Sequence, residues 1–158
     1  MLGLFKSQPH DDATLGRFFR SGGQWRGAIN LHAMNAVPLT ITGSKAAPDA
    51  RALDIARKFP ALLDDLRPAI EHELFEHCTP YLEAIRSGEP AEPGRADILR
   101  IANAADTWAF VQPKALTLKS VAGHLTAELA LTSAWDEEHI FGVYIRDGRF
   151  VEFNASIR

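Results

Sequence analysis

The stretch Phe141-Gly-Val-Tyr-Ile-Arg146, followed by Asp147-Gly148 and Val151-Glu-Phe153, decides the fold of this chain. Its apolar residues fall at every second position, which is the period of a half-buried β-strand. The pair Asp147-Gly148 is a strong signal for a two-residue hairpin turn. The chain is therefore predicted to end in antiparallel strands.

The same alternation recurs in four stretches nearer the start of the chain. Residues 116–119 and 125–132 alternate apolar with polar or small side chains, and so do residues 24–31 and 37–42. The connection between the last two is short enough for a hairpin. Pro38 lacks a backbone N–H group, so it predicts an edge strand or a strand that starts late.

A long helical pattern fills the middle of the chain. Apolar residues recur at steps of three and four between Pro48 and Arg86, which is the spacing of one helical face. Pro48 suits a first helical turn, and Gly88 suits the position just after a helix. Internal prolines remove backbone donors, so they predict a kink or a split into two or three pieces, at Pro60, Pro68 and Pro80.

These patterns predict an α+β fold, with an antiparallel sheet of five or six strands and a kinked helical segment packed on one face. The 158 residues are predicted to form a single domain, in which residues 1–22 are loosely organised. The glycine- and proline-rich stretch 87–95 is the best candidate for a linker, although no change of composition marks a second domain after it. Residues 103–111 fit either a short helix capped by Asn103 or a strand.

The composition narrows the range of functions. A formal net charge of −3 gives no general attraction to phosphate, which argues against nucleic-acid binding. The single cysteine, Cys78, excludes a disulfide within the chain and a multi-cysteine zinc site. No apolar run is long enough to span a bilayer, so no membrane is predicted. Residues 1–5 are too short and poorly flanked for a signal peptide, which makes the cytosol the default location, although other export routes stay open.

Several motifs are better explained by structure than by chemistry. His72 and His77 lie five residues apart, about 140° around a helix, so they are not expected to share a metal ion. Cys78 falls on the apolar helical stripe and is predicted to pack in the core. The stretches Gly22-Gly23 and Gly43-Ser-Lys45 lack the spacing of a phosphate-binding loop and are interpreted as turns.

The stretch Trp135-Asp-Glu-Glu-His139 gathers three carboxylates and an imidazole between two predicted strands. Burying this charge would be costly, so the stretch is predicted to be a loop that faces water, a partner or an ion. Asp136 and Glu138 could coordinate a cation, and His139 could act as a base. In the structural alternative, Asp136 bonds its own backbone and Trp135 packs at the edge of the core. Asp136, Glu137, Glu138 and His139 are the candidate partner- or ligand-binding residues.

At this loop the chain resembles an uncharacterised bacterial family of unknown function with a Trp-Asp-x-Glu-His-Gly signature before its final hairpin. Trp135, Asp136, Glu138 and His139 match the signature, whereas Ile140 stands in place of its glycine. Weaker matches are Trp25-Arg-Gly27, and Leu74-Phe-Glu-His77 through Pro80-Tyr81. The resemblance implies no activity, although some similar small domains look like immunity proteins of bacterial toxin systems.

The leading functional prediction is a non-enzymatic binding or regulatory module. An immunity-type protein that neutralises a partner with a basic surface is one form that such a module could take. No cofactor and no metal are predicted. The alternative is a small hydrolase or metal-dependent enzyme that uses the Asp136–His139 loop with a distant histidine such as His32 or His124. A third reading is a structural domain within a larger assembly. A pocket that holds His139 beside a second histidine would favour the enzyme, and a flat acidic surface with exposed aromatic residues would favour the binding module.

Overall fold

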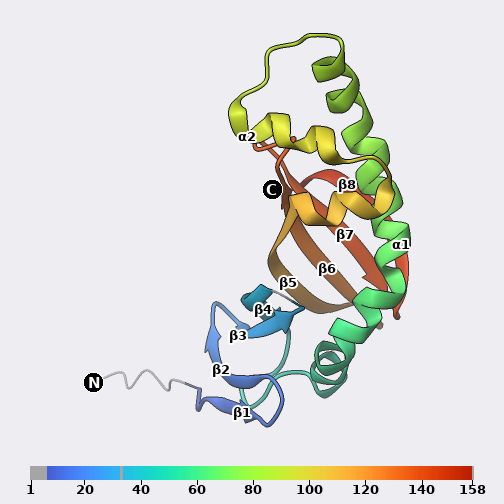
Figure 1. Cartoon of the computed structure of the whole chain (residues 1–158). Coiled ribbons are helices and arrows are strands. Elements are labelled where there is room, and N and C mark those ends of the chain that lie inside the picture. The colour runs from blue at the N-terminus through green and yellow to red at the C-terminus, as the bar shows by residue number, and fades with distance from the viewer. Residues whose placement is uncertain (1–6, 33, 158) are drawn as a thin grey trace.

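The computed structural model describes residues 7–32 and 34–157 (Figure 1). The predicted lack of a signal peptide concerns residues 1–5, which lie outside these ranges. Eight strands form one sheet: β1 (His10–Asp12), β2 (Gly16–Ser21), β3 (Gln24–Leu31), β4 (Met34–Ile41), β5 (Val111–Val121), β6 (His124–Ser133), β7 (Ile140–Arg146) and β8 (Arg149–Ile157). The helical elements between β4 and β5 are α1 (Ala50–Arg86), α2 (Pro93–Ala96) and two 3₁₀ helices, η1 (Asp97–Arg100) and η2 (Ala104–Phe110).

The strands follow one another across the sheet in chain order. Every neighbouring pair is antiparallel except β4 and β5, which run parallel over Leu39–Ile41 and Leu116–Leu118. The prediction of an antiparallel sheet of five or six strands is therefore wrong, because the sheet has eight strands and one parallel pair, although the α+β class is right. The parallel pair follows from the long helical segment between β4 and β5, because parallel neighbours need a crossover connection. Pro38 lies inside β4, opposite Ala28 of β3. Because β4 begins at Met34 and lies between β3 and β5, the prediction of an edge strand or a late start is wrong.

The two strands that the sequence did not reveal lie at the start of the chain. Residues 10–21 were expected to be loosely organised but form β1 and β2. Phe18 is the only buried apolar side chain in these strands, so no alternating pattern marks them. β1 pairs with β2 and β2 pairs with β3, and Asp12 of β1 forms an ion pair with Arg57 of α1.

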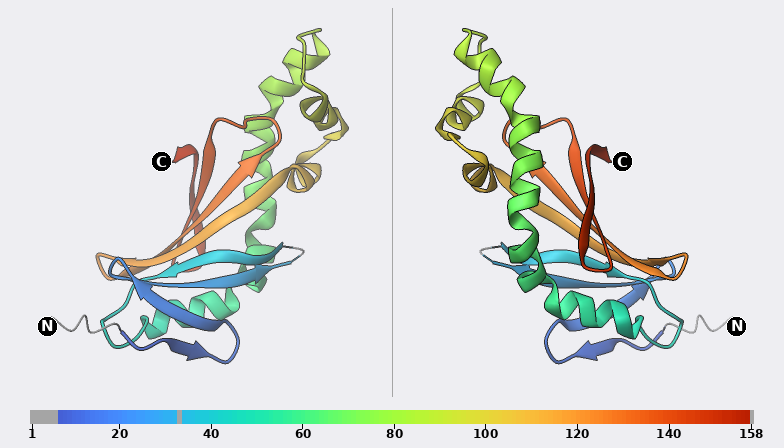
Figure 2. Two further views of the ribbon diagram at one scale, coloured as in Figure 1. Left: turned by 90° about the vertical axis from the view of Figure 1, so that its left-hand side faces the viewer. Right: turned by 90° about the vertical axis from the view of Figure 1, so that its right-hand side faces the viewer.

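The helical segment is one helix of 37 residues, so the expected split into pieces is wrong. Figure 2 shows that α1 changes direction after its first turns, and Pro60 lies in this early part of the helix. Pro68 and Pro80 are exposed, so the carbonyl groups that lose a helical donor lie on the wet side of the helix, where water can serve them. Asp49 caps the first turn by accepting the N–H group of Ala52 at 2.9 Å.

One buried cluster joins the apolar stripe of α1 to one face of the sheet. The right-hand view of Figure 2 shows α1 crossing in front of the C-terminal strands. Along β6 the buried residues Leu125, Ala127, Leu129 and Leu131 alternate with partly exposed ones, as the sequence predicted. Cys78 is also buried in this cluster, which confirms its place in the core. None of the helices in the described ranges combines the length and apolar character needed to cross a membrane.

Local signals in the sequence predicted one further feature correctly and left a second one open. The turn Asp147-Gly148 joins β7 to β8, and both residues have positive φ, 48° and 77°. Asn103 caps η2 by accepting the N–H group of Ala105 at 3.0 Å, which settles the choice between helix and strand for this segment. In turn, the carboxylate of Asp106 accepts the backbone N–H group of Asn103 at 3.1 Å, which completes a capping box.

Candidate functional site

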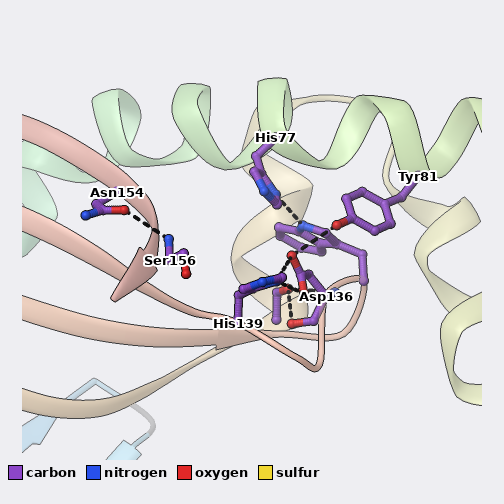
Figure 3. Close-up of polar contacts among 8 residues, drawn as sticks. His77, Tyr81, Asp136, His139, Asn154 and Ser156 are labelled. Atoms are coloured by element: carbon purple, nitrogen blue, oxygen red, sulfur yellow. Dashed lines mark hydrogen bonds and ion pairs between the residues drawn. The ribbon is translucent and has the colours of Figure 1, made fainter. Parts of the chain in front are cut away.

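The loop between β6 and β7 faces the C-terminal part of α1 (Figure 3). Ser133, the last residue of β6, accepts the backbone N–H group of Asp136 with its hydroxyl at 3.1 Å and so turns the chain. Trp135 is 1% exposed, and its indole N–H group donates to Nδ1 of His77 at 3.1 Å. The bond from Trp135 holds the His77 ring in the neutral form, with Nδ1 as an acceptor. The loop is thus anchored to α1 through its tryptophan.

Asp136 is the centre of the polar contacts in this loop. Its carboxylate accepts the Nδ1–H group of His139 at 2.8 Å and the hydroxyl group of Tyr81 at 3.0 Å. The Asp136 side chain is only 7% exposed, whereas that of His139 is 46% exposed. The prediction that the whole acidic stretch faces water is therefore wrong for Asp136. Two donors from different elements offset the cost of burying this carboxylate.

Burial and hydrogen bonding shift three pKa values in this network. Burial acts to raise the pKa of Asp136, but the hydrogen bonds from His139 and Tyr81 outweigh it, and the net pKa lies below the usual value. Burial raises the pKa of Tyr81, and its hydrogen bond to Asp136 raises it further. Burial lowers the pKa of His77, although the charge of Asp136 acts in the opposite direction. At neutral pH the network consists of a charged Asp136, a phenol and a neutral His77.

A pocket of about 450 Å³ opens beside this network. We call it the acidic pocket and define it by its lining residues, Tyr81, Glu92, Gly94, Arg95, Trp135, Asp136, Glu137, Glu138 and His139. Glu92, Glu137 and Glu138 are exposed, and none of them forms an ion pair with the described residues. The guanidinium group of Arg95 lies 5.0 Å from the centre of the Tyr81 ring. This distance is typical of a cation–π contact.

The other histidines singled out in the sequence do not join this site. His32 pairs with Asp64 at 2.9 Å, and His124 pairs with Asp147 at 2.8 Å. His72 is exposed on α1, whereas the ring of His77 turns toward Trp135. His77 accepts the indole N–H group of Trp135 and is not among the residues that line the pocket. In the part of the chain that the structure describes, no three His, Cys, Asp or Glu side chains gather as metal ligands would.

Residues 14–156 match a family described as a domain of unknown function, DUF6985. The chain belongs to this family. The matched region spans β2 to most of β8 and includes every residue of the acidic pocket. For this DUF6985 chain, the predicted resemblance to a family of unknown function is confirmed, while the Trp-Asp-x-Glu-His-Gly signature and a bacterial origin stay predictions. No curated protein and no solved structure matches the chain.

The DUF6985 chain brings four residues to the site that the pattern of the loop could not reveal. Tyr81 and His77 come from α1, and Glu92 and Arg95 come from the segment that leads into and through α2. The stretch 74–81, which contains both Tyr81 and His77, carried one of the weaker family matches, and His77 was also noted for its spacing from His72. Glu92 and Arg95 lie in the presumed linker 87–95, where glycine and proline masked any functional signal.

Proposed function

We propose that this protein is a non-enzymatic binding module that takes a basic side chain of a partner protein into the acidic pocket. The observation that carries the proposal is the position of Arg95. Its guanidinium group lies over the ring of Tyr81 in a pocket that Glu92, Glu137 and Glu138 also line. An arginine or lysine from outside would take the place of Arg95 over this ring, beside the same unpaired carboxylates.

The charge balance of the pocket supports a cationic ligand. Four carboxylates line it, and the only lining cation that is always charged is Arg95. Asp136 is already satisfied by two donors, so it fixes the loop and leaves recognition to the exposed carboxylates. Exposed charges of this kind mainly accelerate association and orient the partner. An immunity-type protein that neutralises a basic toxin in the bacterial cytosol would use such a surface, and we propose this as the cellular role.

Association kinetics with short peptides test the proposal. The probes are a tetra-arginine peptide and a tetra-glutamate peptide, and the variant is Glu137→Gln/Glu138→Gln. We expect the parent to bind the arginine peptide alone, and the variant to associate more slowly with a weaker dependence on salt. Glu76→Gln/Glu83→Gln is the matched control, because it removes two exposed charges from α1 outside the pocket. Equal effects of the two double variants would mean that net charge, and not the pocket, attracts the peptide.

A second candidate function, a hydrolase, has one observation in its favour. Nδ1 of His139 lies 2.8 and 3.0 Å from the two carboxylate oxygens of Asp136, which is how a carboxylate orients a general base. The lining residues include no serine, threonine or cysteine that could serve as a nucleophile, so water would have to attack. Turnover of an ester or phosphoester by the parent, lost in a folded His139→Gln variant, would establish this function in place of binding.

A further inference from the structure

A second pocket lies near the other end of α1. Its volume is about 460 Å³, and it opens between the first turns of α1 and the strands β5, β6 and β7. We call it the apolar pocket, because its walls are formed by Ile55, Leu62, Leu118, Leu125, Ala127 and Ile145. The volume and the apolar walls are those of a typical small-molecule site.

The walls of the apolar pocket belong to the core of the protein. Leu118 and Ile145 are 0% and 1% exposed, so they are held in place by the sheet itself. Ile55 and Leu62 are half-buried and close the pocket from the side of α1. The turn at Gly148 forms part of the rim, and glycine adds no side chain that could fill the opening. The pocket is thus preformed, because part of its apolar wall belongs to the core.

Charged residues at the rim indicate which ligand would fit. Asp54 is paired with Lys58 at 2.7 Å, and Asp147 is paired with His124 at 2.8 Å. Arg51, the third charged lining residue, forms no ion pair with any residue in the ranges 7–32 and 34–157. Each rim carboxylate thus has a hydrogen-bonding partner within the chain, although His124 is charged only when protonated. The guanidinium group of Arg51 has no ion-pair partner in the described ranges, which favours an anionic ligand at this side of the rim.

The position of Arg51 in α1 strengthens this preference. It is the second residue of a helix of 37 residues, where the helix dipole adds partial positive charge. Asp49 takes the backbone N–H group of Ala52, but the first two N–H groups of the helix have no partner within it. An anionic group at the rim would meet both the guanidinium group and this end of the helix.

We propose that the apolar pocket binds an amphipathic monoanion, a small carboxylic acid with an unbranched apolar chain. The carboxylate lies at Arg51, and the chain lies against Leu62, Leu125 and the strand residues behind them. This site is separate from the acidic pocket, and it does not depend on the function proposed there. The two pockets share no lining residue.

Three probes of equal chain length test the proposal: octanoate, octan-1-ol and octylammonium, each titrated by calorimetry and by amide NMR shifts. We expect octanoate to bind about tenfold more tightly than octylammonium, which corresponds to about 1.4 kcal/mol. Arg51→Gln should bring octanoate down to the affinity of octanol and leave octanol unchanged. Arg86→Gln, which removes the same charge from the last turn of α1, should change none of the three affinities.

A second variant locates the site. Ala50 is exposed and lines the pocket, so Ala50→Trp should block the opening without disturbing the core. We expect this variant to melt like the parent and to bind all three probes at least about tenfold more weakly. The proposal is overturned if octanoate does not bind, if octylammonium binds as tightly, if Arg51→Gln keeps the preference for octanoate, or if Ala50→Trp binds octanoate like the parent.

Discussion

The acidic pocket and the apolar pocket lie against different parts of one helix and are built in opposite ways. The acidic pocket is lined by a loop and by α2, and its side chains are fixed by hydrogen bonds that run from Asp136 to Tyr81 and His139. The apolar pocket is lined by α1 and three strands, and its shape is fixed by core packing. The comparison shows that one pocket needs particular polar partners, whereas the other needs only apolar volume and one cation.

The comparison predicts that truncating one lining side chain of each pocket lowers the free energy of unfolding by different amounts. Trp135→Ala should destabilise the protein by about 3 kcal/mol or more, because it empties a large buried volume and removes the bond to His77. Urea denaturation followed by circular dichroism measures this effect. An unchanged midpoint would mean that packing of the Trp135 side chain does not stabilise the protein and that the walls of the acidic pocket rearrange as easily as a surface loop.

The hydrogen bonds at Asp136 predict the next largest effect. Asp136→Asn should lower the free energy of unfolding by about 1–3 kcal/mol, since the amide has one acceptor oxygen in place of two and carries no charge to pair with the donors from Tyr81 and His139. The pKa of Asp136 is lowered in the folded state, so its stabilisation is present above the unfolded pKa of about 3.9 and is lost as the pH falls through the folded value. Denaturation from neutral to acid pH should therefore show the gap between parent and variant shrinking only in strong acid.

The neutral state of His77 predicts a pH dependence in a different range. Because burial lowers its pKa, the unfolded chain takes up a proton more readily than the folded one, and stability falls as the pH drops below about 6.5. His77→Gln should lose less stability than the parent between neutral pH and mild acid, while its amide oxygen can still accept the Trp135 bond. Parallel curves for the two proteins would show that His77 is protonated when folded.

The apolar pocket should respond least to the loss of a wall. Leu62 is half-buried and borders open space, so Leu62→Ala should cost about 1 kcal/mol or less. The same urea denaturation used for Trp135→Ala measures it. A cost near that of Trp135→Ala would mean that the pocket closes in solution and that Leu62 is a full member of the core.

The two pockets also differ in how far the sequence predicted them. The acidic loop was visible because three carboxylates and a histidine follow one another in the chain, and four of the pocket residues were named on this ground. Tyr81, Glu92 and Arg95 were not, because a residue 40 or more positions away gives no local sign of contact with the loop. The apolar pocket could not be predicted from the sequence, since its lining residues follow the same apolar pattern as residues that pack in a filled core.

The sequence by itself determined the local elements: β3 to β8 from alternation, the Asp147-Gly148 hairpin from its turn residues, and the helical stretch from its apolar stripe. These features depend on neighbours within a few positions, which periodicity and turn chemistry record. Only the tertiary structure decided that α1 stays whole, that β1 and β2 join the sheet, that β4 and β5 run parallel, and that Asp136 is buried. Each of these features depends on packing and hydrogen bonds between distant segments. These contacts outweigh three local tendencies: of proline to end a helix, of a weakly patterned terminus to stay irregular, and of a carboxylate to face water.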